Sequence, residues 1–169
     1  MNGVQEADMM ELFDEYSNMV YRIALSYLRQ SQDAEDVVQT VFLKLIEGSI
    51  HPAFGQERAY LTRVTINCCK DVLRSVWKRR IEPLDDTIVF EQAEDRELFE
   101  AVMALPAKQR IVVYLHYYEG YNYSEITDLL QISPSAVSMR IHRAKKLLKD
   151  KLENELREDS HEAQLHKNF

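Results

Sequence analysis

The sequence predicts an all-α protein of two small helical domains joined by an acidic linker. Its 169 residues contain only four Gly and four Pro, which favours long helices over a turn-rich β-fold. Apolar residues recur at helical spacing along most of the chain. Residues 81–93 lack this period and contain Pro83, so we place a linker there. The predicted domains are residues 1–80 and 94–153, followed by a tail over 154–169 for which disorder is one interpretation.

The composition excludes several classes of protein. No run of 18 apolar residues is present, so no segment is expected to span a membrane. The acidic N-terminus lacks the basic and apolar regions of a signal peptide, so we expect a cytoplasmic protein. Cys68 and Cys69 are helical neighbours that point about 100° apart, so they cannot pair with each other. Without a Cys/His cluster they are interpreted as core residues, and no metal or cofactor is expected.

Charge is sorted along the chain. The protein has a net charge of −7, yet residues 57–80 and residues 134–151 each carry +5. Residues 81–100, between the two basic blocks, carry −7. A polyanion responds to the local charge of the surface it meets, so the two basic blocks are candidate nucleic-acid surfaces in an acidic background.

Two helices are expected at the start of the chain. The first, over 9–28, should bury Phe13, Val20, Ile23, Ala24 and Tyr27. The second begins near Ser31, the expected cap, and should bury Ala34, Val38, Val41 and Leu45. Leu43 falls on its polar face. It is either a lone exposed apolar residue or the anchor of a protein-docking surface.

A third helix, over 56–78, combines an apolar face with a basic one. The predicted buried residues are Leu61, Val64, Thr65, Cys68, Cys69 and Val72. The opposite face carries Arg63, Asn67, Lys70, Arg74 and Lys78, flanked by Tyr60 and Trp77. An asparagine amide can contact a base edge, and aromatic rings can stack on exposed bases. The alternative is a solvated charged face.

Four helical segments are expected in the C-terminal domain. The first two cover 95–104 and 107–118, and Gly120 ends the second. Ser124 is expected to cap a short third helix, and Ser133 and Pro134 to begin the fourth, which runs to about Leu152. The predicted core residues of the first three are Leu98, Val102, Leu105, Ile111, Val112, Leu115, Tyr118, Ile126, Leu129 and Leu130.

The last two helices and the tight turn between them form a helix-turn-helix candidate. The last helix should bury Val137, Ile141, Ala144 and Leu148. Its opposite face carries Ser135, Ser138, Met139, His142, Arg143 and Lys146. Such a face can enter a major groove, while the later lysines would contact phosphates: Lys145, Lys146, Lys149 and Lys151. A solvated basic face is again the alternative.

At this point the residues resemble a known family, the bacterial sigma factors of the extracytoplasmic-function (ECF) type. DAEDVVQTVFLKL resembles the segment that docks on the clamp helices of RNA polymerase. AYLTRVTINCCKDVLRS resembles the promoter-melting helix. The sequence from Leu105 to Leu152 is similar to the upstream-element reader along nearly its whole length. The resemblance covers residues 9–80 and 98–152.

The resemblance implies a role for each site residue. The polymerase-docking residues would be Asp33, Glu35, Asp36, Gln39, Phe42 and Leu43, of which Phe42 is the least exposed in a helical projection. The −10 element and its melted strand would be contacted by Tyr60, Arg63, Asn67, Lys70, Arg74, Trp77 and Lys78. The −35 duplex would be read by Ser135, Ser138, Met139, His142, Arg143 and Lys146. The loop over 49–56 would hold a flipped base, and its pocket residues are not assigned.

The implied function is that of a dissociable initiation subunit without enzymatic activity of its own. Its partners would be core RNA polymerase, promoter DNA as duplex and as melted single strand, and an anti-sigma factor that in many systems is membrane-bound and responds to stress. No small-molecule substrate is expected. Two alternatives stay open from the residues: a stand-alone helix-turn-helix regulator, and an adaptor that binds polymerase without melting DNA.

Overall fold

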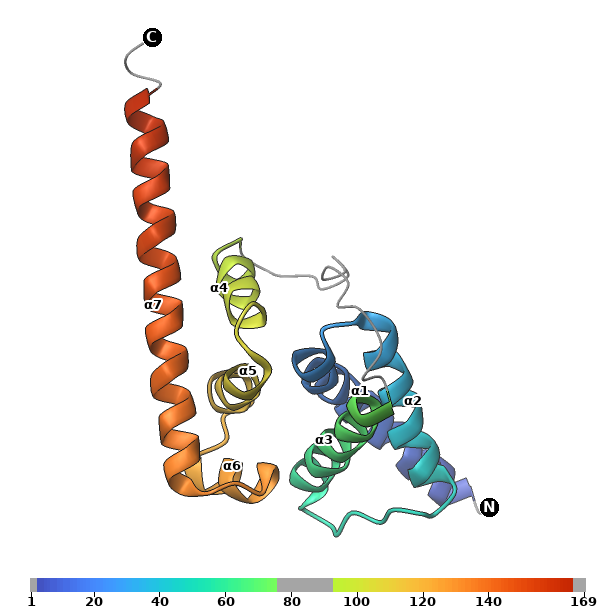
Figure 1. Cartoon of the computed structure of the whole chain (residues 1–169). Coiled ribbons are helices and arrows are strands. Elements are labelled where there is room, and N and C mark those ends of the chain that lie inside the picture. Colours follow the sequence, from blue (N-terminus) through green and yellow to red (C-terminus); the bar gives the residue numbers. More distant parts are fainter. Residues whose placement is uncertain (1–2, 76–92, 166–169) are drawn as a thin grey trace.

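The computed structural model describes residues 3–75 and 93–165 and places them in two packed groups of helices (Figure 1). The N-terminal domain contains α1 (Gly3–Leu28), α2 (Ser31–Ile46) and α3 (Glu57–Ser75). The C-terminal domain contains α4 (Ala93–Met103), α5 (Ala107–Val113), the π-helical turn η1 (Tyr114–Tyr118), α6 (Tyr123–Leu130) and α7 (Pro134–Leu165). The predicted all-α class is therefore confirmed. The two groups touch where α5 packs on α1 and α6 packs on α3.

The core of the N-terminal domain follows the helical period with one exception. Val20, Ile23 and Ala24 of α1 are fully buried, as predicted. Phe13 was expected inside but is 48% exposed. The core at this end is closed by Phe42 of α2, and Phe13 packs only its edge against that ring, with centroids 4.8 Å apart. In α3 the two cysteines and Leu61 are buried as expected, and Thr62 and Ile66 are buried in addition.

The core of the C-terminal domain is built on the predicted stripe of α7. Val137, Ile141 and Ala144 are all buried. Two residues that were predicted to lie in the core are exposed. Leu98 is 48% exposed, because the neighbouring Phe99 takes the inward position on α4.

Tyr118 is the second error, and the π-helical turn explains it. Residues 114–118 were expected to continue an α-helix, but η1 has wider turns. The change in register buries Tyr114 and leaves Tyr118 stacked on it at the surface, with ring centroids 5.1 Å apart. Gly120 then ends this segment with a φ of 74°, a conformation that glycine adopts without strain.

The helix caps differ from the sequence-based expectation at two places. The N-cap of α6 is Asn122, not Ser124: its side chain accepts a hydrogen bond from the Glu125 amide, and the Glu125 carboxylate accepts one from the Asn122 amide. The N-cap of α2 is Gln30, so Ser31 is the first helical residue. The cap of α7 is as predicted, since the Ser133 hydroxyl accepts a hydrogen bond from the Ala136 amide at 3.2 Å.

The last helix is longer than expected. It continues past Leu152 to Leu165, so most of the segment assigned to a tail is helical. Trp77, Lys78 and the predicted linker lie outside the described residues, apart from Ala93, where α4 begins.

The capping box of α6 gives a first prediction. We expect Asn122→Ala to lower the free energy of unfolding by about 1 kcal/mol, because it leaves an N-terminal amide of α6 without its acceptor. Ser124→Ala, at the residue that the sequence pattern favoured as the cap, should change it by less than about 0.5 kcal/mol. Urea denaturation of the two variants measures both values. Equal losses would mean that the box does not stabilise α6.

Candidate polymerase and nucleic-acid interfaces

The reading face predicted for α7 is exposed along its whole length. Val137, Ile141 and Ala144 hold the opposite side of the helix in the core, so the residues between them must point outward. The exposed residues are Ser135, Ser138, Met139, His142, Arg143 and Lys146. Their order along α7 places small and neutral residues at the N-terminal end and the cations later, which suits base contacts at one end and phosphate contacts at the other.

Aromatic residues stand beside this face and were not predicted. Tyr117 and Tyr123 are exposed, and the His116 ring lies within 5.0 Å of each of them. Lys145 of α7 lies over the Tyr117 ring, 5.9 Å from its centroid. Hydrogen bonding to Tyr117 and the electrostatic interaction with it raise the pKa of Lys145. The π-helical turn places Tyr117 beside Lys145. A projection that assumes α-helical geometry could not have predicted this position.

The basic face of α3 has Asn67 at its centre. Arg63, Asn67 and Arg74 are exposed, and Lys70 is half-buried. Cys68, Cys69 and Leu61 are buried on the other side and fix this orientation. The Arg74 guanidinium donates to the Asp71 carboxylate at 3.0 Å, in a pair that is largely exposed. The face that the sequence predicted is thus present from Tyr60 to Arg74.

A groove of about 420 Å³ opens at the start of α3, where the two domains meet. Its N-terminal wall includes Tyr60 and Arg63, two predicted DNA contacts, and its other wall includes Tyr121 and Glu125. Within the preceding loop, Gly55 and Gln56 line the groove and Phe54 is fully exposed. The sequence could not assign these loop residues, because an irregular loop has no periodicity from which to infer which of its side chains face the groove.

The predicted docking face of α2 divides into exposed and buried residues. Glu35, Asp36 and Gln39 are exposed, and Leu43 is 53% exposed among them. Asp33 and Phe42 were predicted to lie on this surface, but both residues are buried. Phe42 closes the core against Phe13, and Asp33 lies in the first turn of α2. Both residues lie inside the domain because the buried stripe of α2 is wider than predicted. The observed stripe also includes Val37.

The adjacent cysteines are free thiols in the core of the N-terminal domain. Burial raises the pKa of Cys68, although its hydrogen bond from the Lys44 ammonium, at 3.7 Å, acts in the opposite direction. Burial raises the pKa of Cys69 strongly. Such thiols are poor nucleophiles and metal ligands, which agrees with their interpretation as core residues. Among the described residues no group of three potential metal ligands occurs.

Comparisons with known proteins identify the two domains. Residues 12–79 match the family described as Sigma-70 region 2, and residues 95–148 match Sigma-70, region 4. The ECF RNA polymerase sigma factor SigL of Mycobacterium tuberculosis is 30% identical over 163 residues, covering 87% of this chain and 90% of SigL. The chain belongs to the ECF sigma factors.

Two further comparisons extend this result. SigE of Mycolicibacterium smegmatis, also an ECF sigma factor, is 30% identical over 84% of this chain, which spans 60% of the length of SigE. The sigma factor RpoE of Bartonella quintana, solved in complex with the anti-sigma factor NepR, has the same fold with a TM-score of 0.69. That match covers 86% of this chain and 97% of RpoE at 20% identity.

Membership of this family makes the protein a DNA-binding transcription-initiation factor. In this ECF sigma factor, the basic face of α3 lies within the segment that matches Sigma-70 region 2, and the basic face of α7 lies within the segment that matches Sigma-70, region 4. No helix in the described ranges is both long enough and apolar enough to cross a membrane.

The Arg74–Asp71 pair gives a second prediction. If the α3 face binds DNA, Asp71→Asn should strengthen binding of a non-template oligonucleotide to the sigma–polymerase complex by roughly two- to fivefold, because it removes a negative charge and releases Arg74. Fluorescence anisotropy at low salt measures the affinity. Glu100→Gln is the matched control, since it breaks the exposed Arg96–Glu100 pair on α4. An unchanged or weaker affinity for Asp71→Asn would contradict a DNA contact at this end of α3.

Proposed function

We propose that the protein binds core RNA polymerase through α2 and directs it to promoters that carry two elements. The observation that carries this proposal is the exposure of two separate basic faces, on α3 and α7, within the two sigma regions. The α7 face reads the −35 duplex in the major groove, where its N-terminal residues contact base edges. The α3 face binds the −10 element.

The α3 face is suited to a melted strand rather than to duplex. Asn67 offers an amide that can donate to and accept from a base edge, and the neighbouring cations can follow one phosphate backbone. Tyr60 lies in the groove at the start of α3, where an unstacked base could rest on its ring. Binding energy released only when the bases unstack favours strand opening. The Trp77 ring is assigned to the same strand.

The polymerase contact is assigned to the exposed part of α2. Leu43 is an apolar side chain surrounded by Glu35, Asp36 and Gln39, the pattern of an anchor with a polar rim. A second groove of about 350 Å³ lies beside it, between α1 and α2, and Tyr21, Glu35 and Gln39 line it. Asp33 and Phe42 act through the fold, by holding α2 in place.

The protein acts by binding alone, and nucleotide addition belongs to the polymerase. It works in the cytoplasm, where the transcription machinery is. An anti-sigma factor controls it; the similar sigma factor RpoE was solved in complex with the anti-sigma factor NepR. The stand-alone helix-turn-helix regulator is the less favoured alternative, because residues 12–79, most of the N-terminal domain, match Sigma-70 region 2.

Transcription reconstituted from purified components tests the proposal. Addition of the chain to core polymerase should give run-off transcripts from a subset of a promoter library, which core enzyme alone does not give. Leu43→Ala should weaken binding to core polymerase by about tenfold or more, because it removes the apolar anchor. Leu98→Ala is the matched control, because Leu98 of α4 is also a leucine and has a similar exposure. The proposal is wrong if no promoter responds. The docking assignment is wrong if the two variants bind polymerase equally.

A further inference from the structure

Met139 lies on the ridge of the exposed α7 face. Val137, Ile141 and Ala144 are buried on the opposite side of the helix. At a turn of about 100° per residue, Met139 points about 170° away from the middle of that buried stripe. It is more directly opposed to the stripe than any other residue from Pro134 to Arg143. Its side chain therefore reaches furthest toward a ligand that is placed against this face.

Met139 also differs in chemistry from the residues around it. It is 50% exposed. Between Pro134 and Lys146, a stretch that the structure describes completely, it is the one large apolar side chain on the exposed side. The neighbouring exposed residues are polar or charged, namely Ser135, Ser138, His142 and Arg143. Polar groups of a ligand can find hydrogen-bonding partners in these neighbours but not in Met139.

The position of Met139 along α7 suits contact with bases rather than with phosphates. Met139 lies in the second turn of α7, and the N-terminal turns of a recognition helix contact base edges. The major groove is about 12 Å wide and about 8.5 Å deep, so it admits a helix with its ridge toward the floor. Lys145 lies about 120° around the helix from Met139 and over the Tyr117 ring, at the edge of the face where a phosphate backbone would pass.

Thymine is the base whose major-groove edge matches a methionine side chain. Its C5-methyl group is the one apolar group that the four bases present in this groove. The other bases present hydrogen-bond donors and acceptors, and a thioether is only a weak acceptor. Placing Met139 against those edges would remove water from polar groups without replacing their hydrogen bonds. Against thymine the same contact buries two apolar groups, and the unbranched side chain can adjust to the methyl group.

Arg143 indicates which base lies near that thymine. It follows Met139 by one turn on the same side of α7, and it is exposed. An arginine side chain pairs with O6 and N7 of guanine through two hydrogen bonds. One helical turn of about 5.4 Å corresponds to about two base pairs of 3.4 Å each. A guanine is therefore expected within about two base pairs of the thymine.

We propose that Met139 makes the −35 preference of this protein depend on one thymine methyl group, which packs against the methionine side chain in the major groove. The proposal rests on the proposed function, because it requires α7 to lie in the major groove of the −35 duplex. It deepens that function by naming the chemical group that one position of the element presents. That group is the C5-methyl of a pyrimidine, with a guanine nearby for Arg143.

Replacement of thymine by deoxyuridine tests the proposal, because the two bases differ only in the C5-methyl group. The duplex is a promoter selected by run-off transcription with the full chain and core polymerase, and each thymine of its −35 element is replaced in turn on either strand. At one position, deoxyuridine should weaken binding of the sigma–polymerase complex by about three- to fivefold, the effect of losing one buried methyl group. Competition against the labelled parent duplex measures the affinity. The proposal is overturned if no replacement weakens binding by about twofold or more.

Three variants assign the effect to Met139. Met139→Ala removes the apolar tip, so thymine and deoxyuridine at the sensitive position should bind equally. Met139→Leu should keep the preference, because leucine is apolar and similar in volume. Met10→Ala is the matched control, since Met10 of α1 is also an exposed methionine, and it should keep the whole effect. If Met139→Ala still loses three- to fivefold with deoxyuridine, another side chain contacts the methyl group and the proposal is refuted.

Methylated cytosine gives a second test, in which a contact is gained. A cytosine–guanine pair at the sensitive position lacks the methyl group, and 5-methylcytosine restores it without changing the hydrogen-bonding groups. The wild-type complex should bind the methylated duplex about three- to fivefold more tightly than the unmethylated one. Met139→Ala should bind both equally. Equal binding of the two duplexes by the wild type would contradict the proposal.

Run-off transcription separates failure of this proposal from failure of the proposed function. If promoters respond to the chain but no methyl group in the −35 element affects binding, the Met139 contact is wrong and the sigma activity stands. If no promoter responds, the proposed function fails, and the Met139 contact fails with it.

Discussion

The burial of one stripe on each reading helix is the constraint on which this structure depends. Val137, Ile141 and Ala144 hold α7 against its domain, and each large apolar side chain buried in this way contributes about 1.5–3 kcal/mol relative to exposure. A helix held along one stripe has no freedom to rotate, so the identity of its outward residues is decided by the core and not by the ligand. The same holds for α3, where two buried cysteines and Leu61 turn Asn67 outward. The residues exposed on the two proposed DNA-binding faces are thus determined by the packing of the core.

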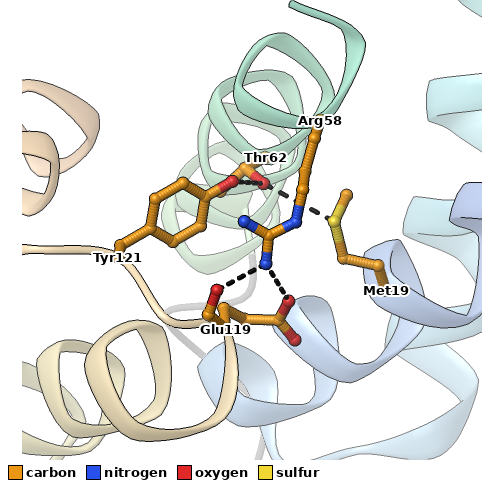
Figure 2. Close-up of polar contacts among 5 residues, drawn as sticks. All are labelled: Met19, Arg58, Thr62, Glu119 and Tyr121. Atoms are coloured by element: carbon orange, nitrogen blue, oxygen red, sulfur yellow. Dashed lines mark hydrogen bonds and ion pairs between the residues drawn. The ribbon is translucent and has the colours of Figure 1, made fainter.

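The interface between the two domains contains polar contacts as well as apolar ones. One continuous apolar core runs through both domains. Polar contacts stand beside it: Arg110 of α5 donates to the Tyr27 carbonyl of α1, and Arg58 of α3 pairs with Glu119 (Figure 2). Removing one partner from a buried polar contact such as that of Arg110 leaves carbonyls unsatisfied, at a cost of roughly 1–3 kcal/mol for each group.

Much of this could be predicted from the sequence, because helical periodicity is a local property. The buried stripes of α3 and α7 and the exposure of Leu43 follow from residue spacing within one helix. The failures have physical causes that spacing does not carry. The π-helical turn changed the register of the helix, so that Tyr118 lies at the surface and not in the core as predicted. The capping box chose Asn122 over Ser124, because Glu125 completes a reciprocal pair only with that residue. Arg110 could not be recognised as an interdomain contact, since its partners are backbone carbonyls more than 80 residues away in the sequence.

The central claim is that α3 and α7 contact two different promoter elements in one complex. Site-specific photocrosslinking tests it most directly, with a benzophenone amino acid placed at Met139 in one protein and at Asn67 in another. In an open complex with core polymerase, Met139 should crosslink to duplex near position −35, and Asn67 to the non-template strand near −10, about 25 base pairs or 85 Å downstream. Crosslinks from both positions to the same element, or from neither to DNA, would contradict the account.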